Sequence, residues 1–313
     1  MKLDGRQTAE ALYSHNHILL ITHKNPDGDT LGSAAALCHA LRRAGKQAFL
    51  FPNPQITEKY LPFVEKYFAD DGFEPEYVVA VDVAAKDMVN RGFSGKINLC
   101  IDHHPSEHDF ADDELVIPEL SACGEIVLQV IDELCGKVSK AEANLLYIAL
   151  STDTGCFQYA NTNANSFRNA ARLLDAGCEN WPLNSRFFRK QSRARLQLEG
   201  MIYAGMKFYH DGIVCVATVT QEMIEKSGAT EDDFEDLAAL PGRIEDEKLG
   251  ITIRELDDGD CKVSVRSTED ISSSDICAYF GGGGHRMAAG CTISATPEKA
   301  AELLMNVVDE VLR

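Results

Sequence analysis

The stretch Ile18-Leu19-Leu20-Ile21-Thr22 is followed by a helical pattern over residues 31–44 that ends before Gly45. Such a short apolar run predicts a strand, and the apolar spacing after it predicts an amphipathic helix closed by a glycine. Three further apolar runs follow, at residues 47–51, 77–81 and 97–101. Runs of this kind, separated by helix-compatible segments, are typical of a mostly parallel sheet with helices on both faces, which is an α/β fold.

The second half of the chain changes character. Helical patterns are predicted over residues 124–135, 139–152, 165–176 and 192–206. Strand-like stretches follow at residues 213–218, 250–256 and 262–266, and an amphipathic helix is predicted over residues 297–312. A chain of 313 residues is expected to form two domains. We predict a first domain at 1–190, a linker helix at 191–207 and a smaller mixed α/β C-terminal domain at 208–313.

The composition is that of a globular protein, with 45% apolar and 25% charged residues. No signal-peptide pattern and no run long enough to cross a bilayer is present, so we expect a cytoplasmic protein without a membrane partner. The ten cysteines are scattered singly, which favours reduced thiols over disulfides or a zinc site. The net charge of −19 argues against binding long duplex nucleic acid, but a small anion can bind where cations are concentrated.

Three potential ligands follow the first predicted strand, in the turn His23-Lys24-Asn25-Pro26-Asp27-Gly28-Asp29. One imidazole and two carboxylates on one short turn can converge, and loops at the carboxyl ends of strands are where open α/β sheets bind ligands. Taken alone, the motif is equally compatible with a polar turn in which Asp29 caps the next helix.

Carboxylates also follow later apolar segments. Asp82 follows residues 77–81, Asp102-His103-His104 ends the run at 97–101, and Asp153 follows the apolar helical segment 145–150. One such aspartate is usually only a strand exit. Four polar ends with the same ligand chemistry indicate a metal site.

The charges indicate a pair of ions. Asp27, Asp29, Asp82 and Asp153 would repel one another strongly unless two divalent cations neutralised them. Oxygen and imidazole ligands suit manganese-like or magnesium-like ions. Two metals about 3.5–4 Å apart can activate a hydroxide and clamp the oxygens of a displacement at phosphorus. The sequence therefore predicts a two-metal phosphoesterase.

A second motif, Gly281-Gly282-Gly283-Gly284-His285-Arg286, lies near the C-terminus. Consecutive glycines let backbone amides approach an anion closely, although a flexible loop would have the same composition. His285 and the strand-borne Arg266 favour binding of a substrate phosphate or carboxylate. We expect this loop to face the metals across an interdomain cleft that holds the active site.

The remaining notable residues carry no functional prediction. Five histidines lack ligand-like neighbours in the sequence: His15, His17, His39, His108 and His210. The single tryptophan, Trp181, is interpreted as a packing residue, and the basic segment 186–191 as a helix surface.

In order and spacing, these motifs resemble the DHH phosphoesterase family with its DHH-associated C-terminal domain. Within it, the pattern is most similar to the compact NrnA-type group, which degrades short oligoribonucleotides and dephosphorylates 3′-phosphoadenosine 5′-phosphate. The shared stretches are Pro26-Asp27-Gly28-Asp29, Gly32-Ser33, Thr152-Asp153-Thr154-Gly155, Phe157 and Arg266-Ser267. The sequence departs from the family at Val83-Ala84-Ala85-Lys86 and at Glu107.

The resemblance implies roles for single residues. His23, Asp27 and Asp82 would hold one manganese ion, with magnesium or cobalt as substitutes. Asp29, Asp82, His103 and Asp153 would hold the other, so Asp82 bridges the two. His104 would lie beside the substrate phosphate, and Asp102 would orient an imidazole, which makes Asp82, Asp102 and His104 the predicted catalytic residues. The predicted substrate-binding residues are Arg266, Ser267, Gly282, Gly283, Gly284 and His285.

The implied activity is manganese-dependent hydrolysis of short single-stranded RNA or a small nucleotide, and a homodimer is compatible with the sequence. A cyclic di-AMP or linear dinucleotide phosphodiesterase would use the same metals. The family's pyrophosphatases carry a Ser-Arg-Lys-Lys-Gln pattern that this chain lacks, and RecJ-type exonucleases would need further basic domains. A non-catalytic nucleotide-binding module would be expected to lack metal ligands, and none is missing here.

Overall fold

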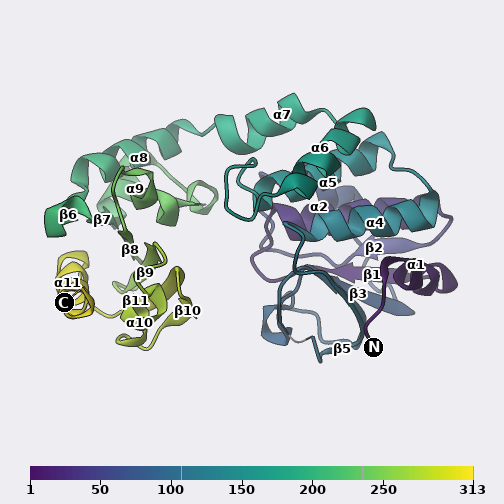
Figure 1. Ribbon diagram of the computed structural model, residues 1–313, viewed down its shortest axis with the longest axis horizontal. Helices are drawn as coiled ribbons and strands as arrows, with labels where there is room; N and C mark the ends of the chain where they lie inside the picture. Colours follow the sequence, from purple (N-terminus) through teal and green to yellow (C-terminus); the bar gives the residue numbers. More distant parts are fainter. Residues whose placement is uncertain (107, 235, 313) are drawn as a thin grey trace. The chain divides into compact units, whose positions relative to one another are not determined.

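The computed structural model describes residues 1–106, 108–234 and 236–312, so Glu107 lies outside the described residues. The chain divides into two compact units, Met1–Lys190 and Gln191–Arg313 (Figure 1). No helix in the described part of the chain is both long and apolar enough to cross a membrane.

A five-stranded parallel sheet forms the centre of the first unit. Its strands are β1 (Ile18–Ile21), β2 (Ala48–Leu50), β3 (Tyr77–Val81), β4 (Ile97–Asp102) and β5 (Ala111–Val116). Their order is β2-β1-β3-β4-β5, and each neighbouring pair is parallel. Strand β2 lies on one side of β1 and strand β3 lies on the other side, so the strand order reverses between β1 and β3. Ligands of open α/β sheets bind outside the carboxyl ends of strands at such a point.

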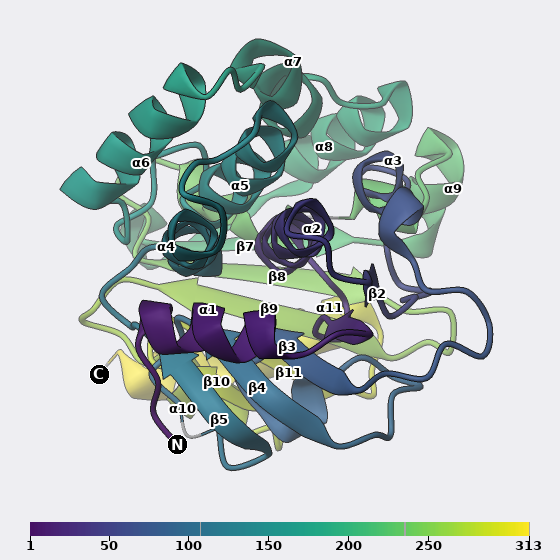
Figure 2. The same ribbon diagram turned by 90° about the vertical axis from the view of Figure 1, so that its right-hand side faces the viewer.

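The helices of this unit are α1 (Gly5–Ser14), α2 (Gly28–Arg43), α3 (Leu61–Val64), α4 (Cys123–Cys135), α5 (Lys140–Asp153), α6 (Ala164–Asp175) and α7 (Asn180–Asn184). Helices α1, α2 and α4 lie on one side of the sheet (Figure 2), where Leu20, Val79 and Ile101 are buried in the main core. The opposite face, with Leu19 and Val78, is covered by loop aromatics and the short 3₁₀ helix η2 (Lys86–Met88).

The second unit is a mixed six-stranded sheet. Its strands are β6 (Lys207–Tyr209), β7 (Val214–Val219), β8 (Leu249–Glu255), β9 (Cys261–Ser267), β10 (Gly283–His285) and β11 (Ala288–Ile293). The order is β10-β11-β9-β8-β7-β6, and only the β7–β8 pair of the described strands is parallel. Its helices are α8 (Arg193–Gly205), α9 (Gln221–Ser227), α10 (Ser273–Ala278) and α11 (Pro297–Val311). The predicted α/β class with a second mixed domain is confirmed.

Some elements differ from the sequence-based expectation. Strand β5 was not predicted, because its sequence Ala-Asp-Asp-Glu-Leu-Val carries three acidic residues and little apolar pattern. Gly283 and Gly284 belong to strand β10, so the glycine run is partly a strand and not wholly a loop. Helix α8, within the predicted linker, buries Leu198 and Ile202 in a core of the second unit.

Helices α2 and α5 pack closely because glycine stands at their contact. A Cβ atom at Gly32 would lie 2.4 Å from the carbonyl oxygen of Leu145 and 2.9 Å from the backbone nitrogen of Ala149. A Cβ at Gly28 would lie 2.3 Å from the hydroxyl oxygen of Thr152. This approach places the start of α2 beside the end of α5, where Asp153 is the last residue.

We expect Gly32→Ala to lower the free energy of unfolding by roughly 2 kcal/mol, because the added methyl meets backbone atoms that must move apart. Gly200→Ala in α8 is the control, since a Cβ there meets nothing within 4 Å. That change is expected to raise stability by about 0.5–1 kcal/mol through helix propensity. Urea denaturation measures both, and an unchanged Gly32→Ala protein would contradict the close contact.

Candidate metal centre

The predicted ligands of the first unit meet at the carboxyl ends of the strands. His23 follows β1, Asp82 follows β3, and His103 follows β4 directly. Asp29 lies in the first turn of α2, and Asp153 is the last residue of α5. Segments far apart in the sequence thus bring their side chains to the edge where β1 and β3 reverse the strand order.

One group of ligand atoms surrounds His23. Its Nε2 lies 3.6 Å from Asp27 Oδ1 and 3.8 Å from Asp82 Oδ2. The potential ligand atoms of these three residues all lie within 4.8 Å of one another. His23 Nδ1 donates a hydrogen bond of 2.8 Å to the carbonyl oxygen of Lys24, which can only accept. A neutral His23 therefore turns the lone pair of Nε2 toward the two carboxylates.

A second group surrounds His103. Its Nε2 lies 3.6 Å from Asp82 Oδ1, and 3.8 Å from Oδ2 of both Asp29 and Asp153. His103 Nδ1 donates to the carbonyl oxygen of Leu120 at 3.2 Å, so its Nε2 is also free to bind a cation. Oδ2 of Asp82 thus faces His23, and Oδ1 of Asp82 faces His103. The bridging role of Asp82 stays a prediction, but its side chain already has the orientation that such a role requires.

Asp29 is held by the start of helix α4. The backbone N–H groups of Cys123 and Gly124 donate to its two oxygens at 2.7 and 3.0 Å, and the Ser33 hydroxyl donates at 2.9 Å. Such helix-terminal N–H groups favour a negative charge. The alternative in which Asp29 caps α2 is wrong, because the cap is Asp27, whose Oδ1 accepts the N–H groups of Asp29 and Thr30.

Asp82 occupies an unusual backbone and electrostatic position. Its φ is 59°, a left-handed conformation that non-glycine residues seldom adopt and that recurs at functional sites. The side chain is 3% exposed, and Oδ1 is buried without a hydrogen-bond donor. Burial and the charges of Asp29 and Asp27 raise the pKa of Asp82 well above its usual range. A carboxylate oxygen that accepts no hydrogen bond, among several converging carboxylates, fits a bound divalent cation. Such a cation would remove the repulsion between the carboxylates.

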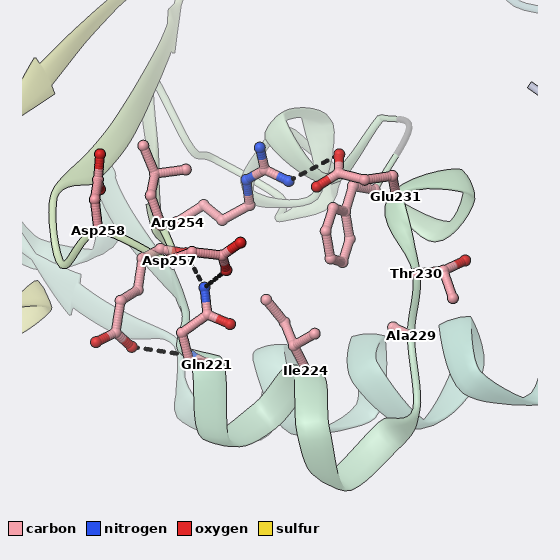
Figure 3. A pocket seen from close by; sticks show the side chains of 11 residues that line it. Gln221, Ile224, Ala229, Thr230, Glu231, Arg254, Asp257 and Asp258 are labelled. Atoms are coloured by element: carbon pink, nitrogen blue, oxygen red, sulfur yellow. Dashed lines mark hydrogen bonds and ion pairs between the residues drawn. The ribbon is translucent and has the colours of Figure 1, made fainter. Parts of the chain in front are cut away.

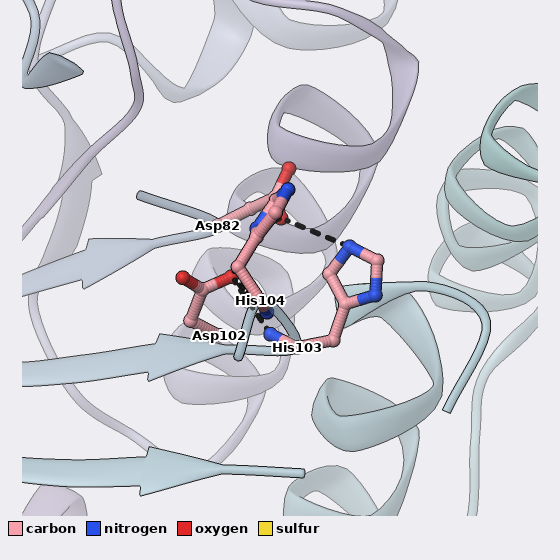
Figure 4. A group of neighbouring side chains, drawn as sticks. All are labelled: Asp82, Asp102, His103 and His104. Carbon is pink, nitrogen blue, oxygen red and sulfur yellow. Dashed lines mark hydrogen bonds and ion pairs between the residues drawn. The ribbon is translucent and has the colours of Figure 1, made fainter. Parts of the chain in front are cut away.

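Asp102 occupies the centre of a hydrogen-bond network and not a free ligand position (Figure 4). Its Oδ1 accepts the N–H groups of His103 and His104 at 2.7 and 3.2 Å, and the Nδ1–H of His104 at 2.8 Å. Burial alone would raise the pKa of Asp102, yet hydrogen bonds from His104 and His108 hold it well below its usual range. These contacts support the prediction that Asp102 orients an imidazole.

Two polar residues that contact the centre, His108 and Asn161, are not among the site residues predicted from the sequence. His108, which carried no functional prediction, contacts the centre, because its Nε2 lies 2.6 Å from Asp102 Oδ2. The side chain of Asn161 donates to Asp153 Oδ2 at 3.3 Å. The signal for both was only their nearness in the sequence to Asp102 and Asp153.

The second unit brings two of the predicted substrate-binding residues onto one face. Arg266 of β9 pairs with Ala288 of β11, which in turn pairs with His285 of β10. Directly paired residues of antiparallel strands point to the same side of a sheet, so the exposed side chains of Arg266 and His285 flank the small Ala288.

The other predicted substrate-binding residues of this unit shape the backbone. The Ser267 hydroxyl donates to the Ile271 carbonyl oxygen at 2.8 Å and is thus engaged within its own unit. A Cβ at Gly282 would lie 2.3 Å from the carbonyl oxygen of Gly290, and Gly284 has a φ of 146°. Glycine at these two positions allows the close approach of β10 and β11. Gly283 lies between Gly282 and Gly284 in the chain and belongs to the exposed edge strand β10.

A separate pocket of about 380 Å³ also lies in the second unit (Figure 3). Its Arg254 lies 4.7 Å over the ring of Phe234 and 3.6 Å from Glu231 Oε2. None of the predicted substrate-binding residues lines it.

Comparison with known proteins identifies the family. The profile described as the DHH family, N-terminal domain, matches residues 17–150, and the DHHA1 domain matches residues 211–313. A Thermus thermophilus protein named bifunctional oligoribonuclease and PAP phosphatase NrnA is 33% identical, over 98% of this chain and 94% of its own length. This chain belongs to the DHH family. It is accordingly a hydrolase that acts on phosphoester bonds.

Other relatives of this DHH family member extend over the same length. A Bacillus subtilis protein of the same name is 25% identical, over 91% of both chains. The crystal structure of an exopolyphosphatase-related protein from Bacteroides fragilis has a TM-score of 0.88 at 24% identity, covering 98% of this chain and 96% of that one. A structure of exonuclease RecJ bound to manganese has a TM-score of 0.51 at 13% identity, covering 98% and 94%. The two structures show a shared fold.

The crowded carboxylates make the stability of the metal-free DHH protein depend on pH. Burial and the charge of Asp153 raise the pKa of Asp29 to about 7. Burial and the charge of Asp27 raise the pKa of Asp153 to about 7. The folded chain therefore holds protons that the unfolded chain has already lost between about pH 4 and 7, so this contribution to stability is lost as the pH rises.

We expect the melting temperature of the chelator-treated protein to fall as the pH is raised from 5 to 8. In Asp153→Asn the fall should be smaller than in the parent by about 5 °C. That variant removes one of the two groups and the charge that perturbs the other. Asp175→Asn, at the exposed end of α6, is the control and should keep the pH dependence of the parent. Equal pH dependence in Asp153→Asn and the parent would show that the carboxylates are not coupled as described.

Proposed function

We propose that the substrates of this hydrolase are short oligoribonucleotides and 3′-phosphoadenosine 5′-phosphate, and that two manganese ions serve the reaction. The observation that carries the proposal is the position of Asp82, whose two oxygens face two separate imidazole and carboxylate groups. The names of the Thermus thermophilus and Bacillus subtilis relatives support the choice of substrates. The donors, which are oxygen and imidazole without thiolate, support a manganese-like or magnesium-like ion.

His23 and Asp27 would hold one ion and Asp29, His103 and Asp153 the other. When bound, a pair of divalent cations supplies a nucleophilic oxygen at neutral pH and neutralises charge on the phosphoryl group. The protein contributes the fixed positions of these donors. Nδ1 of each histidine donates a hydrogen bond to a backbone carbonyl oxygen, and backbone N–H groups donate to the oxygens of Asp29, so these side chains are held in place by the protein itself.

His104 is suited to contact the phosphate. Its Nδ1–H is held by Asp102, so Nε2 is the nitrogen left for the substrate, and the side chain is 44% exposed. The hydrogen bond from Nδ1 to Asp102 raises the pKa of His104. A raised pKa favours an imidazolium that can donate a hydrogen bond to a phosphate oxygen or a proton to the leaving oxygen.

Arg266 and His285 would bind the part of the substrate away from the reacting phosphorus. A guanidinium and an imidazole on one sheet face provide donors for a second phosphate, which both proposed substrates possess. The predicted placement of the active site in an interdomain cleft stays a prediction, as does dimerisation.

We expect Asp82→Asn to lower kcat for 3′-phosphoadenosine 5′-phosphate in the presence of manganese by at least about 10³-fold, because the position would lose its negative charge. Asparagine tolerates a left-handed backbone, so folding should be retained. Asp87→Asn is the matched control, since Asp87 is 81% exposed and pairs only with Lys24 among the described contacts. Full activity in Asp82→Asn would exclude the proposed role.

A substrate panel tests the proposed specificity. Initial rates with manganese are compared for RNA of two to five nucleotides, 3′-phosphoadenosine 5′-phosphate, cyclic di-AMP and pyrophosphate. We expect kcat/KM for the first two to exceed that for the last two by about tenfold or more, because each tenfold step needs only about 1.4 kcal/mol of differential binding. A preference for cyclic di-AMP would replace the proposed substrates with a cyclic dinucleotide.

A further inference from the structure

His108 is a buried histidine that the proposed reaction does not use. It lies six residues after Asp102, is 3% exposed, and belongs to the turn between β4 and β5. Its Nε2 lies 2.6 Å from Asp102 Oδ2, whereas the hydroxyl of Ser106 is 3.5 Å away. A carboxylate can only accept, so Nε2 of His108 must carry the hydrogen.

Asp102 thus joins two imidazoles of different exposure. Its Oδ1 holds the partly exposed His104, and its Oδ2 holds the buried His108. Asp102 itself is fully buried, so without His108 its Oδ2 would lose its described donor inside the protein. Leaving a charged acceptor unsatisfied costs more than an ordinary hydrogen bond is worth, so the carboxylate would no longer be held in this rotamer.

We infer that His108 is a positioning residue for the phosphoesterase reaction: it fixes the carboxylate of Asp102, and through it the ring of His104. This inference rests on the proposed function. His104 keeps its Nδ1–H on Asp102 and its Nε2 toward the substrate only while the Asp102 carboxylate stays in one rotamer. Groups that orient the residues around a metal centre typically contribute 10–100-fold to activity or metal affinity.

A competing explanation is a third metal ion, because ligand atoms of Cys100, Asp102 and His108 lie within 4.8 Å of one another. The described contacts argue against it. Both oxygens of Asp102 already accept hydrogen bonds, and the Cys100 thiol faces the carbonyl oxygen of Val83 at 3.8 Å. Burial raises the pKa of Cys100 well above its usual value, which disfavours the thiolate that a metal ligand would require.

The other ring nitrogen distinguishes positioning from simple packing. His108 Nδ1 is buried without a hydrogen-bond partner, and the nearest described carboxylate, Glu114 Oε2, is 3.5 Å away. Nε2 is thus the ring nitrogen of His108 that makes a short hydrogen bond, to Asp102, among the described contacts. A side chain that donates from the position of Nε2 should replace the function of His108, and one that merely fills its volume should not.

Two variants of the full chain separate these roles. In His108→Gln the amide nitrogen reaches the position of Nε2 and can donate to Asp102, whereas His108→Phe fills similar space without a donor. We expect His108→Phe to lose roughly 10–100-fold in kcat for 3′-phosphoadenosine 5′-phosphate, and His108→Gln to stay within about threefold of the parent. KM and the manganese affinity measured by titration calorimetry should change by less than about twofold in both, because no proposed ligand contacts His108.

A readout independent of activity follows the imidazoles themselves. Long-range ¹H–¹⁵N spectra of histidine-labelled protein should show His104 as the Nδ1–H form in the parent and in His108→Gln. In His108→Phe we expect that resonance to broaden or to shift to a mixture of tautomers, with thermal melting used to check that the variant is folded.

Several outcomes would overturn the inference. One is a kcat of His108→Phe within twofold of the parent, and another is an equal loss in the glutamine and phenylalanine variants. A third is a metal content of three ions per chain that falls to two when His108 is replaced. Absence of manganese-dependent turnover in the parent would instead refute the proposed function, and the spectra would still decide whether His108 orients His104.

Discussion

Mutual repulsion among buried carboxylates is the constraint around which the first unit is organised. Asp29, Asp82 and the partly exposed Asp153 approach the same histidine to within 3.8 Å, and the burial of Asp29 and Asp82 weakens the solvent screening among these charges. Such a cluster can persist only if the fold supplies compensation. The N-terminus of α4 provides it for Asp29, and the Asn161 amide provides it for Asp153, whereas Oδ1 of Asp82 accepts no hydrogen bond and fits a bound cation.

The packing of the helices serves this arrangement. Glycines at the α2–α5 contact let the backbone of one helix approach the other closely enough for the start of α2 to meet the end of α5. The reversal of strand order between β1 and β3 then adds His23 and Asp82 from the sheet. His103, directly after β4, completes the site, which therefore depends on tertiary contacts among five elements and cannot form in an isolated loop.

The sequence predicts those parts of the fold that local patterns encode. Strand β3 has the bounds of its apolar run, residues 77–81, because a strand buried on both faces is apolar throughout. Strand β5 at the sheet edge is not predicted, because Asp112, Asp113 and Glu114 interrupt the apolar pattern by which strands are recognised. The aspartates at the strand ends were recognisable from ligand chemistry, whereas the contact of His108 with Asp102 depends on the path of a turn, which no local periodicity encodes.

The left-handed backbone of Asp82 limits how this site can change over evolutionary time. At a φ of 59°, most side chains that carry a Cβ are strained, and asparagine and glycine are the replacements with the least cost. A lineage that abandoned phosphoester chemistry would be expected to drift to one of these two residues at position 82 while keeping its fold. Under the proposed role of Asp82, the identity of this one residue would separate active from silent descendants of the same fold.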